Sequence, residues 1–253
     1  MTHASIDRIA PTLRPSGRVV MRQSWSHLLF LHWVLPAETL QALIPSGLEI
    51  DTFEGNAYIG LVPFTMIGVR PSWAFSVPGL SNFHEINVRT YVHRDGRDPG
   101  VWFFSLDAAQ SIAVRIARSF WTLPYHFARM SLSHKEDGTV DYRSERLWPG
   151  PLPAACKMIY RPEGSPQASQ PGTLEHFLAE RYFLYAQGRR SLLRGQVHHT
   201  PYPLQNATVI SLDESLVSAS GFTKPNEEPL AHYASRVDVR IYALQTVTNG
   251  TIV

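Results

Sequence analysis

The clearest pattern along the chain is an alternation of apolar and polar side chains between residues 83 and 93. One side carries Ile86, Val88, Thr90 and Val92, and the other carries Glu85, Asn87, Arg89 and Tyr91. Successive side chains of an extended strand point to opposite faces, so this period of two predicts a β-strand. A turn sequence at residues 94–97 follows, and residues 101–107 are predicted to form the returning strand of a hairpin.

The same reasoning predicts strands over much of the remaining chain. β-branched and aromatic residues indicate a strand at 57–69, directly after a turn sequence at 54–56. A second hairpin is expected from 125–134 and 139–147, joined by Glu136-Asp137-Gly138. Later strands are predicted at 156–161, 191–198 and 232–244. The Pro- and Gly-containing segment 161–172 is predicted to be a polar loop.

Three segments have helical rather than strand character. Residues 37–44 are expected to form a short helix that stops before Pro45. Residues 111–121 place Ile112, Ile116 and Phe120 at helical spacing. The aromatic cluster of Phe103, Phe104, Phe120 and Trp121 is expected in the core rather than around a ligand. Thr173 is the expected N-cap of a helix through residue 185.

Many strands with few helices predict a mainly β protein, built as a barrel with helices outside it or at one end. The chain has 253 residues, which one such domain can accommodate. We therefore expect a flexible lead-in at residues 1–16 and a single barrel domain at residues 17–248.

Composition limits the classes of partner. The formal net charge is only +2, a balance that favours neither nucleic acid nor an anionic membrane. A single cysteine, Cys156, allows no intrachain disulfide, and the N-terminal segment lacks the apolar run of a signal peptide. The most apolar early run, residues 28–35, is too short to cross a bilayer. A cytoplasmic location is therefore the expectation.

Several familiar cofactor and metal patterns are absent from the sequence. It has no glycine-rich dinucleotide fingerprint, no phosphate loop, no Gly-x-Ser-x-Gly elbow and no paired-cysteine zinc pattern. His198 and His199 are neighbours, which on a strand point to opposite faces. His126 and His134 would lie about 26 Å apart along one strand. We therefore predict neither a cofactor nor a metal site.

The polar face of the strand at 83–93 is the strongest candidate for chemistry. If it lines the interior of a barrel, Glu85 and Arg89 are suited to bind a carboxylate or to move a proton. Alternation alone is more typical of a half-exposed strand whose polar face lies in water. Residues 236–242 show the same pattern, but an ion ladder of Arg236, Asp238 and Arg240 on a solvent face is the favoured interpretation there.

Lysine is scarce, and this bears on nucleophilic chemistry. The chain contains three lysines, Lys135, Lys157 and Lys224, whereas all other basic residues apart from histidine are arginines. Lysine forms imines with carbonyl compounds, while arginine offers a fixed fork for carboxylates. Lys157 lies within an apolar run and would become nucleophilic if buried, although an edge-strand lysine facing solvent is the commoner arrangement.

Several separated segments resemble the acetoacetate decarboxylases. The segment Thr39-Leu-Gln-Ala-Leu-Ile-Pro-Ser-Gly-Leu-Glu-Ile-Asp51 is similar to the helix-then-strand opening of that family. Its landmarks Leu-Asp, Ile-Ala-Val, Arg and Pro are matched at 106–107, 112–114, Arg118 and Pro124, with a two-residue insertion before Arg118. Five further segments resemble the YqjF-like family more closely, a bacterial family of unknown function in the same superfamily: 87–91, 103–107, 123–125, 198–205 and 232–238.

This resemblance implies a closed antiparallel β-cone or barrel with a buried ligand pocket. The decarboxylases carry two lysines directly after the proline, and the first forms an imine with the substrate. The matching positions here are Tyr125 and His126, so no Schiff base can form there. The decarboxylase glutamate is matched by Glu85, whereas its early active-site arginine falls on Ser26.

Three functions follow as hypotheses. The first is a small-molecule-binding barrel for a small carboxylate or carbonyl compound, with Glu85, Tyr125 and His126 as catalytic candidates. Its ligand-binding candidates are Asn87, Arg89, Asp107 and Arg118. The second is a lyase with a relocated lysine at Lys157, and the third is an interaction module with a filled interior. A homo-oligomer is compatible with all three.

Overall fold

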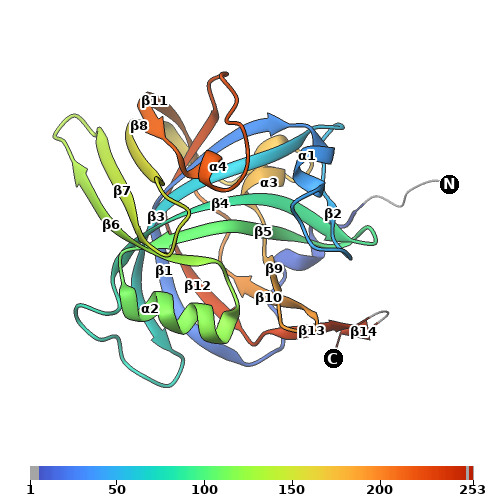
Figure 1. Cartoon of the computed structure of the whole chain (residues 1–253). Coiled ribbons are helices and arrows are strands. Elements are labelled where there is room, and N and C mark those ends of the chain that lie inside the picture. The colour runs from blue at the N-terminus through green and yellow to red at the C-terminus, as the bar shows by residue number, and fades with distance from the viewer. Residues whose placement is uncertain (1–5, 249–250, 253) are drawn as a thin grey trace.

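The computed structural model describes residues 6–248 and 251–252 of the chain. Almost all of its regular structure is one strongly curved β-sheet (Figure 1). Its strands are β1 (Val19–Leu35), β2 (Glu49–Ile50), β3 (Ala57–Pro71), β4 (Phe83–Arg94), β5 (Arg97–Ala108), β6 (Tyr125–His134), β7 (Val140–Trp148), β8 (Ala155–Gln167), β9 (Phe183–Gln187), β10 (Leu192–His198), β11 (Leu204–Glu214), β12 (Leu230–Tyr242), β13 (Gln245–Thr248) and β14 (Thr251–Ile252).

The sheet closes on itself twice. One ring runs through β1, β3, β4, β5, β9, β10 and β12, and a second runs through β1, β3, β4, β5, β6, β7, β8, β11 and β12. The rings share β12, β1, β3, β4 and β5. The predicted mainly β, ring-like architecture is confirmed, but the pairings of β5 with β6 and with β9 are parallel rather than antiparallel. A shared wall of this kind buries both faces of its strands.

The buried apolar residues form separate clusters on the two faces of this shared wall. One apolar cluster contains Leu29, Ile86 and Val88 from the shared wall, together with Tyr142 of β7 and Cys156 of β8. A second cluster lies on the opposite face and includes Leu28, Phe30, Val62 and Phe64 with Val197 of β10. Neighbouring residues such as Leu28 and Leu29 thus contribute to different cores, as the period of a strand requires.

Two of the longer strands were not predicted from the sequence. β1 is the clearest case, because residues 28–33 are buried without interruption and show no alternation. A continuous apolar run of this kind is typical of a strand buried on both faces, but periodicity cannot distinguish it from a buried helix. β11 was also missed. The polar loop expected at 161–172 is wrong in its first half, since β8 continues to Gln167 and pairs with β11.

The helices are shorter than predicted. α1 spans Ala37–Gln41 and α4 spans Leu216–Ala219, and the 3₁₀-helix η1 spans Ala10–Thr12. α3 covers only Leu174–Ala179: Thr173 accepts the capping hydrogen bond from the backbone of His176 as predicted, but the chain then turns into β9. α2 spans Ser111–Ile116 and continues as a π-helical turn, η2 (Ala117–Trp121). None of the described helices is long and apolar enough to cross a lipid bilayer.

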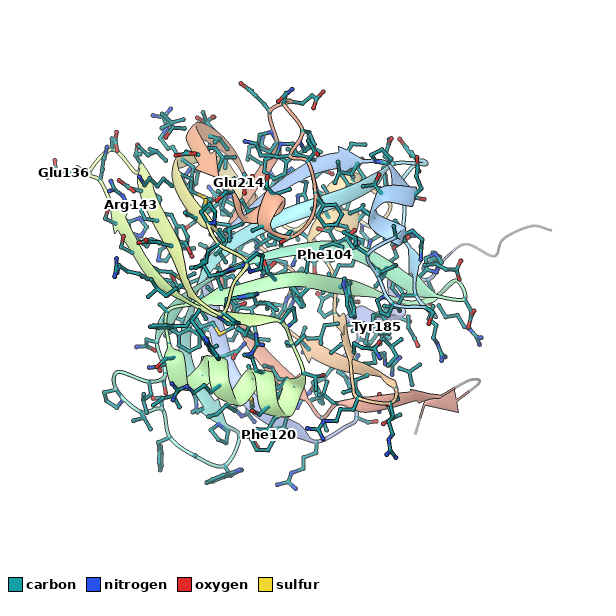
Figure 2. All side chains as sticks on the ribbon, in the orientation of Figure 1. Phe104, Phe120, Glu136, Arg143, Tyr185 and Glu214 are labelled. Atoms are coloured by element: carbon teal, nitrogen blue, oxygen red, sulfur yellow. The ribbon has the colours of Figure 1, made fainter. Side chains whose placement is uncertain are left out.

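The apolar stripe of α2 and η2 lies outside the core, and the expectation of a buried Phe120 is wrong. Ile112 and Ile116 are half exposed, and Phe120 is 76% exposed on the outer side of the helix (Figure 2). The neighbouring loop between β3 and β4 exposes Trp73 and Phe75, and Gln110 ties the helix start to this loop by donating to the Gly79 carbonyl. The turn therefore stands outside the sheet, where it leads into β6.

Candidate functional site

The polar face of β4 is buried, so its interpretation as a half-exposed strand is wrong. Glu85, Asn87, Arg89 and Tyr91 are all less than one-tenth exposed. Val62 and Phe64 of β3 lie directly opposite Asn87 and Glu85, and Leu106 and Ala108 of β5 lie opposite the same pair on the other side. Paired residues of adjacent strands share a face. Glu85 and Asn87 are thus polar groups in an apolar surround.

Tyr125 is the direct partner of Glu85. Its hydroxyl donates a hydrogen bond of 2.8 Å to Oε2 of Glu85. The tyrosine is the first residue of β6, which follows the left-handed residue Thr122 at the end of η2. Arg118 fixes this corner, because its Nη1 donates to the Tyr125 carbonyl at 2.6 Å and its guanidinium lies over the Trp148 ring. Arg118 thus supports the site from its exposed side.

Burial gives this pair unusual acidities. It raises the pKa of the Glu85 carboxyl to about 8, opposed in part by the Tyr125 hydrogen bond and reinforced by the nearby charge of Asp107. Burial and the adjacent glutamate hold the pKa of Tyr125 well above its usual value. At neutral pH Glu85 is therefore mainly a protonated acid, and its pKa lies close to the pH at which most proteins function. A carboxyl with this acidity is suited to general acid–base chemistry.

Asp107 and His126 lie on the other face of the sheet. They are paired in register, and Asp107 is opposite Ile86 of the first core cluster rather than Glu85. Both carboxylate oxygens of Asp107 accept bonds of 2.7 Å from Arg146 of β7, and both side chains are buried. Nδ1 of His126 bonds the Pro149 carbonyl at 2.8 Å. The wall between the rings separates these two candidates from Glu85 and Tyr125.

Arg89 lies further along the same face as Glu85. Its Nη2 donates to the Leu178 carbonyl at 3.2 Å and to the Tyr91 hydroxyl at 3.3 Å, and its guanidinium lies over the Phe30 ring. Among the described residues it forms no ion pair with a carboxylate. Nε2 of His32 bonds the Tyr91 hydroxyl at 2.6 Å, and burial, followed by the Arg89 charge, holds the pKa of His32 well below its usual value.

Several buried polar atoms on the Glu85 face have no partner within the described protein. They include Oδ1 of Asn87, Nε of Arg89 and Nε1 of Trp25, whose ring packs at 5.8 Å against Phe64. Buried polar groups are almost always hydrogen-bonded, so each such atom calls for an explanation. The alternation on β4 predicted Asn87, but Trp25 was missed because β1 was not recognised as a strand.

The alternative nucleophile, Lys157, is exposed on β8, where it lies opposite Arg143 and Asp213. Ser26, at the position of the decarboxylase arginine, is buried on β1. The residues described include no cluster of three or more His, Cys, Asp or Glu side chains arranged for a metal ion. Among the candidate residues, the Glu85–Tyr125 pair thus offers the most suitable chemistry.

Comparison with known proteins establishes the family of the chain. The model of the DUF2071 family, described as an uncharacterized conserved protein, matches residues 22–238. The chain belongs to this family. It is 40% identical over 231 residues to the uncharacterized protein YqjF of Bacillus subtilis (strain 168), covering 91% of this chain and 94% of YqjF. The resemblance inferred from the sequence is confirmed.

Solved structures share the fold of this DUF2071 protein. The enduracididine biosynthesis enzyme MppR complexed with pyruvate has a TM-score of 0.63 at 13% identity, over 94% of this chain and 93% of MppR. An acetoacetate decarboxylase of Legionella pneumophila also has a TM-score of 0.63, at 12% identity, over 96% of this chain and 93% of that one. At these identities the likeness establishes an acetoacetate-decarboxylase-like fold.

Proposed function

We propose that this protein binds a small carbonyl compound, such as a 2-oxo acid, beside Glu85 and Tyr125, and that Glu85 exchanges a proton with it. The observation that carries the proposal is a buried carboxyl with a pKa near neutrality that receives a hydrogen bond from a tyrosine hydroxyl. The unpartnered Oδ1 of Asn87, two residues along the same face, would accept a hydrogen bond from the ligand. The pyruvate complex of MppR supports this choice of ligand class.

The chemical step needs no imine. The ionised Glu85 carboxylate removes a proton from the carbon next to the carbonyl. The electron pair of that C–H bond forms a C=C bond, and the π pair of the C=O bond moves onto the carbonyl oxygen. The Tyr125 hydroxyl, released from Glu85 as the latter becomes protonated, donates to the oxygen that gains negative charge. Return of the proton from Glu85 restores the ligand. With a pKa of about 8, Glu85 is populated in both protonation states near neutral pH.

The separation of Arg89 from Glu85 determines how long a ligand must be to contact both side chains. It lies four residues from Glu85 along β4, which corresponds to about 13 Å at the rise of a strand. A three-carbon acid is too short to contact both side chains. We therefore assign Arg89 to the carboxylate of longer ligands only, with Asp107 and Arg118 as supporting rather than ligand-binding residues.

Deuterium exchange into the methyl group of pyruvate in D₂O, followed by proton NMR, tests the proposal. The wild-type protein should accelerate exchange over buffer, and Glu85→Gln should lower the protein-dependent rate by about 10²-fold or more. Tyr125→Phe should also lower it, through loss of the donor. Glu49→Gln, a change at an exposed glutamate of β2, is the matched control and should leave the rate unchanged. Equal rates in wild type and Glu85→Gln would refute the proposal.

The lysine alternative is tested in the same samples. Borohydride reduction with pyruvate traps an imine as a permanent mass increase on the lysine that formed it. Because Lys157 is exposed and lies far along the sheet from Glu85, we expect no such increase. An adduct on Lys157 would replace the proton-exchange mechanism with a lyase mechanism.

A further inference from the structure

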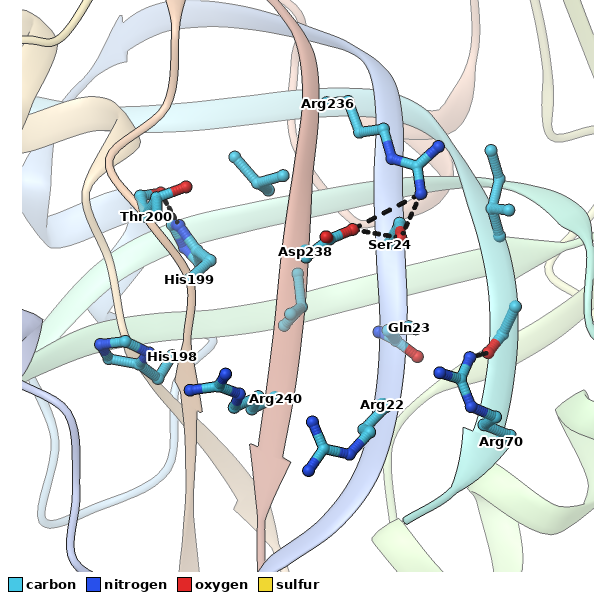
Figure 3. A pocket seen from close by; sticks show the side chains of 14 residues that line it. Arg22, Gln23, Ser24, Arg70, His198, His199, Thr200, Arg236, Asp238 and Arg240 are labelled. Atoms are coloured by element: carbon cyan, nitrogen blue, oxygen red, sulfur yellow. Dashed lines mark hydrogen bonds and ion pairs between the residues drawn. The ribbon is translucent and has the colours of Figure 1, made fainter. Parts of the chain in front are cut away.

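Three arginines and a histidine form a row across adjacent strands, on a part of the sheet that the Glu85 site does not use. Arg22 of β1 lies directly opposite Arg240 of β12 on one side and Arg70 of β3 on the other. Arg240 in turn lies opposite His198 of β10. Figure 3 shows these four side chains in a line across one hollow. With strands about 4.8 Å apart, the row is about 14 Å long.

The row faces a hollow of about 840 Å³, a volume typical of small-molecule sites. Asp238 is the acidic residue that lines it, and this carboxylate is already engaged by the Ser24 hydroxyl at 2.6 Å and by Arg236 at 3.5 Å. Arg70 bonds the Gly68 carbonyl at 2.9 Å. Within the described part of the chain, none of Arg22, Arg70 and Arg240 forms an ion pair with a carboxylate.

With no anion bound, repulsion between the neighbouring arginines of the row destabilises this part of the sheet. Like charges directly opposite one another on adjacent strands destabilise a sheet. The effect on a neighbouring group is visible: after burial, the charges of Arg240 and Arg14 are the causes that lower the pKa of His198. A multivalent anion in the hollow would remove this repulsion, and the planar guanidinium forks suit phosphate oxygens.

We propose that this hollow binds a small compound with two or more linked phosphate groups, held across Arg240, Arg22 and Arg70. The length of the row favours a ligand with several negative charges over a ligand with a single one. The limited volume of the hollow, and a formal net charge of only +2 for the whole chain, favour a small ligand over a polynucleotide. Neither Glu85 nor Tyr125 lines the hollow, so this inference does not depend on the proposed function.

Isothermal titration with inorganic pyrophosphate at fixed ionic strength tests the proposal. The wild-type protein should bind it saturably and more tightly than it binds sulfate. Arg22→Gln and Arg240→Gln should each weaken binding at least tenfold. Arg115→Gln, at an exposed arginine of α2, is the matched control and should change the Kd less than twofold. Both hollow variants should melt no lower than wild type, because each removes a repelled charge.

Two results would overturn the proposal. The first is pyrophosphate binding that is absent, no tighter than sulfate, or equal in wild type and in Arg22→Gln. The second is tight binding of a 20-nucleotide single-stranded DNA that Arg22→Gln abolishes, without any saturable binding of pyrophosphate, since this would assign the row to a polynucleotide. If Arg22→Gln fails to fold, Arg70→Gln provides the same comparison at the other end of the row.

Discussion

Glu85 shows how a single residue acquires reactivity from its surroundings. Its neighbours across the sheet are apolar, its one side-chain partner is a phenol, and the buried carboxyl consequently prefers to keep its proton. The alternating pattern of β4 was sufficient to predict this residue as a candidate. It could not predict the acidity, because the pKa depends on burial by strands that are distant in the sequence.

The acidity of Glu85 has a measurable effect on stability. Its folded-state pKa of about 8 exceeds the value near 4.3 of an unfolded glutamate, so the folded protein binds the extra proton between these limits. Its contribution to stability is complete below about pH 4 and is lost as the pH rises toward about 8, by up to about 1.4 kcal/mol per pH unit. Urea unfolding between pH 5 and pH 9 should show this slope in wild type relative to Glu85→Gln. Parallel pH profiles for the two proteins would contradict the assignment.

At the scale of the elements, the ion pair of Asp107 and Arg146 joins β5 to β7 through the interior of the second ring. Removing one partner leaves the other charge buried and unpaired. We expect Arg146→Ala to lower the free energy of unfolding by about 3–5 kcal/mol. Asp107→Leu combined with Arg146→Met should restore most of this loss, and urea denaturation of the single and double variants checks both values. A loss below about 1 kcal/mol in Arg146→Ala would mean that the arginine is not buried.

The sequence predicted most elements of the fold, for a physical reason. Hairpins such as β4–β5 and β6–β7 are local, and their turns and alternation lie within short windows of sequence. β1 was missed because both its faces are buried, and β9 was absorbed into a predicted helix. Arg146, the partner of the candidate Asp107, was missed because it comes from β7, whose place in the sheet only the tertiary fold determines. The contact of Arg236 with Asp238 was expected from the ladder pattern, whereas Ser24, which also bonds Asp238, lies on the unpredicted β1.

At the scale of the whole molecule, closure of the first ring depends on a close approach at Gly100. A Cβ atom at this position would lie 2.7 Å from the Phe183 carbonyl oxygen, closer than real Cβ contacts allow. Gly100→Ala should push β9 away from β5 and destabilise the protein by about 1–3 kcal/mol. Amide hydrogen exchange should increase in β9 and β10 but not in β6 and β7. Equal protection in all four strands would show that the backbone adjusts without opening the ring.

Cys156 is a natural probe of how often the second ring of the sheet opens. Its thiol is fully buried in the apolar cluster that β7 and β8 enclose, and burial raises its pKa, so reagents in solution cannot modify it while the second ring stays closed. As the single cysteine of the chain, it yields one unambiguous labelling rate. That rate measures how often the second ring opens, independently of events at Gly100 in the first. Opening of the second ring can therefore be followed in the unmodified chain by labelling of Cys156, separately from opening of the first ring, which amide exchange in β9 and β10 reports.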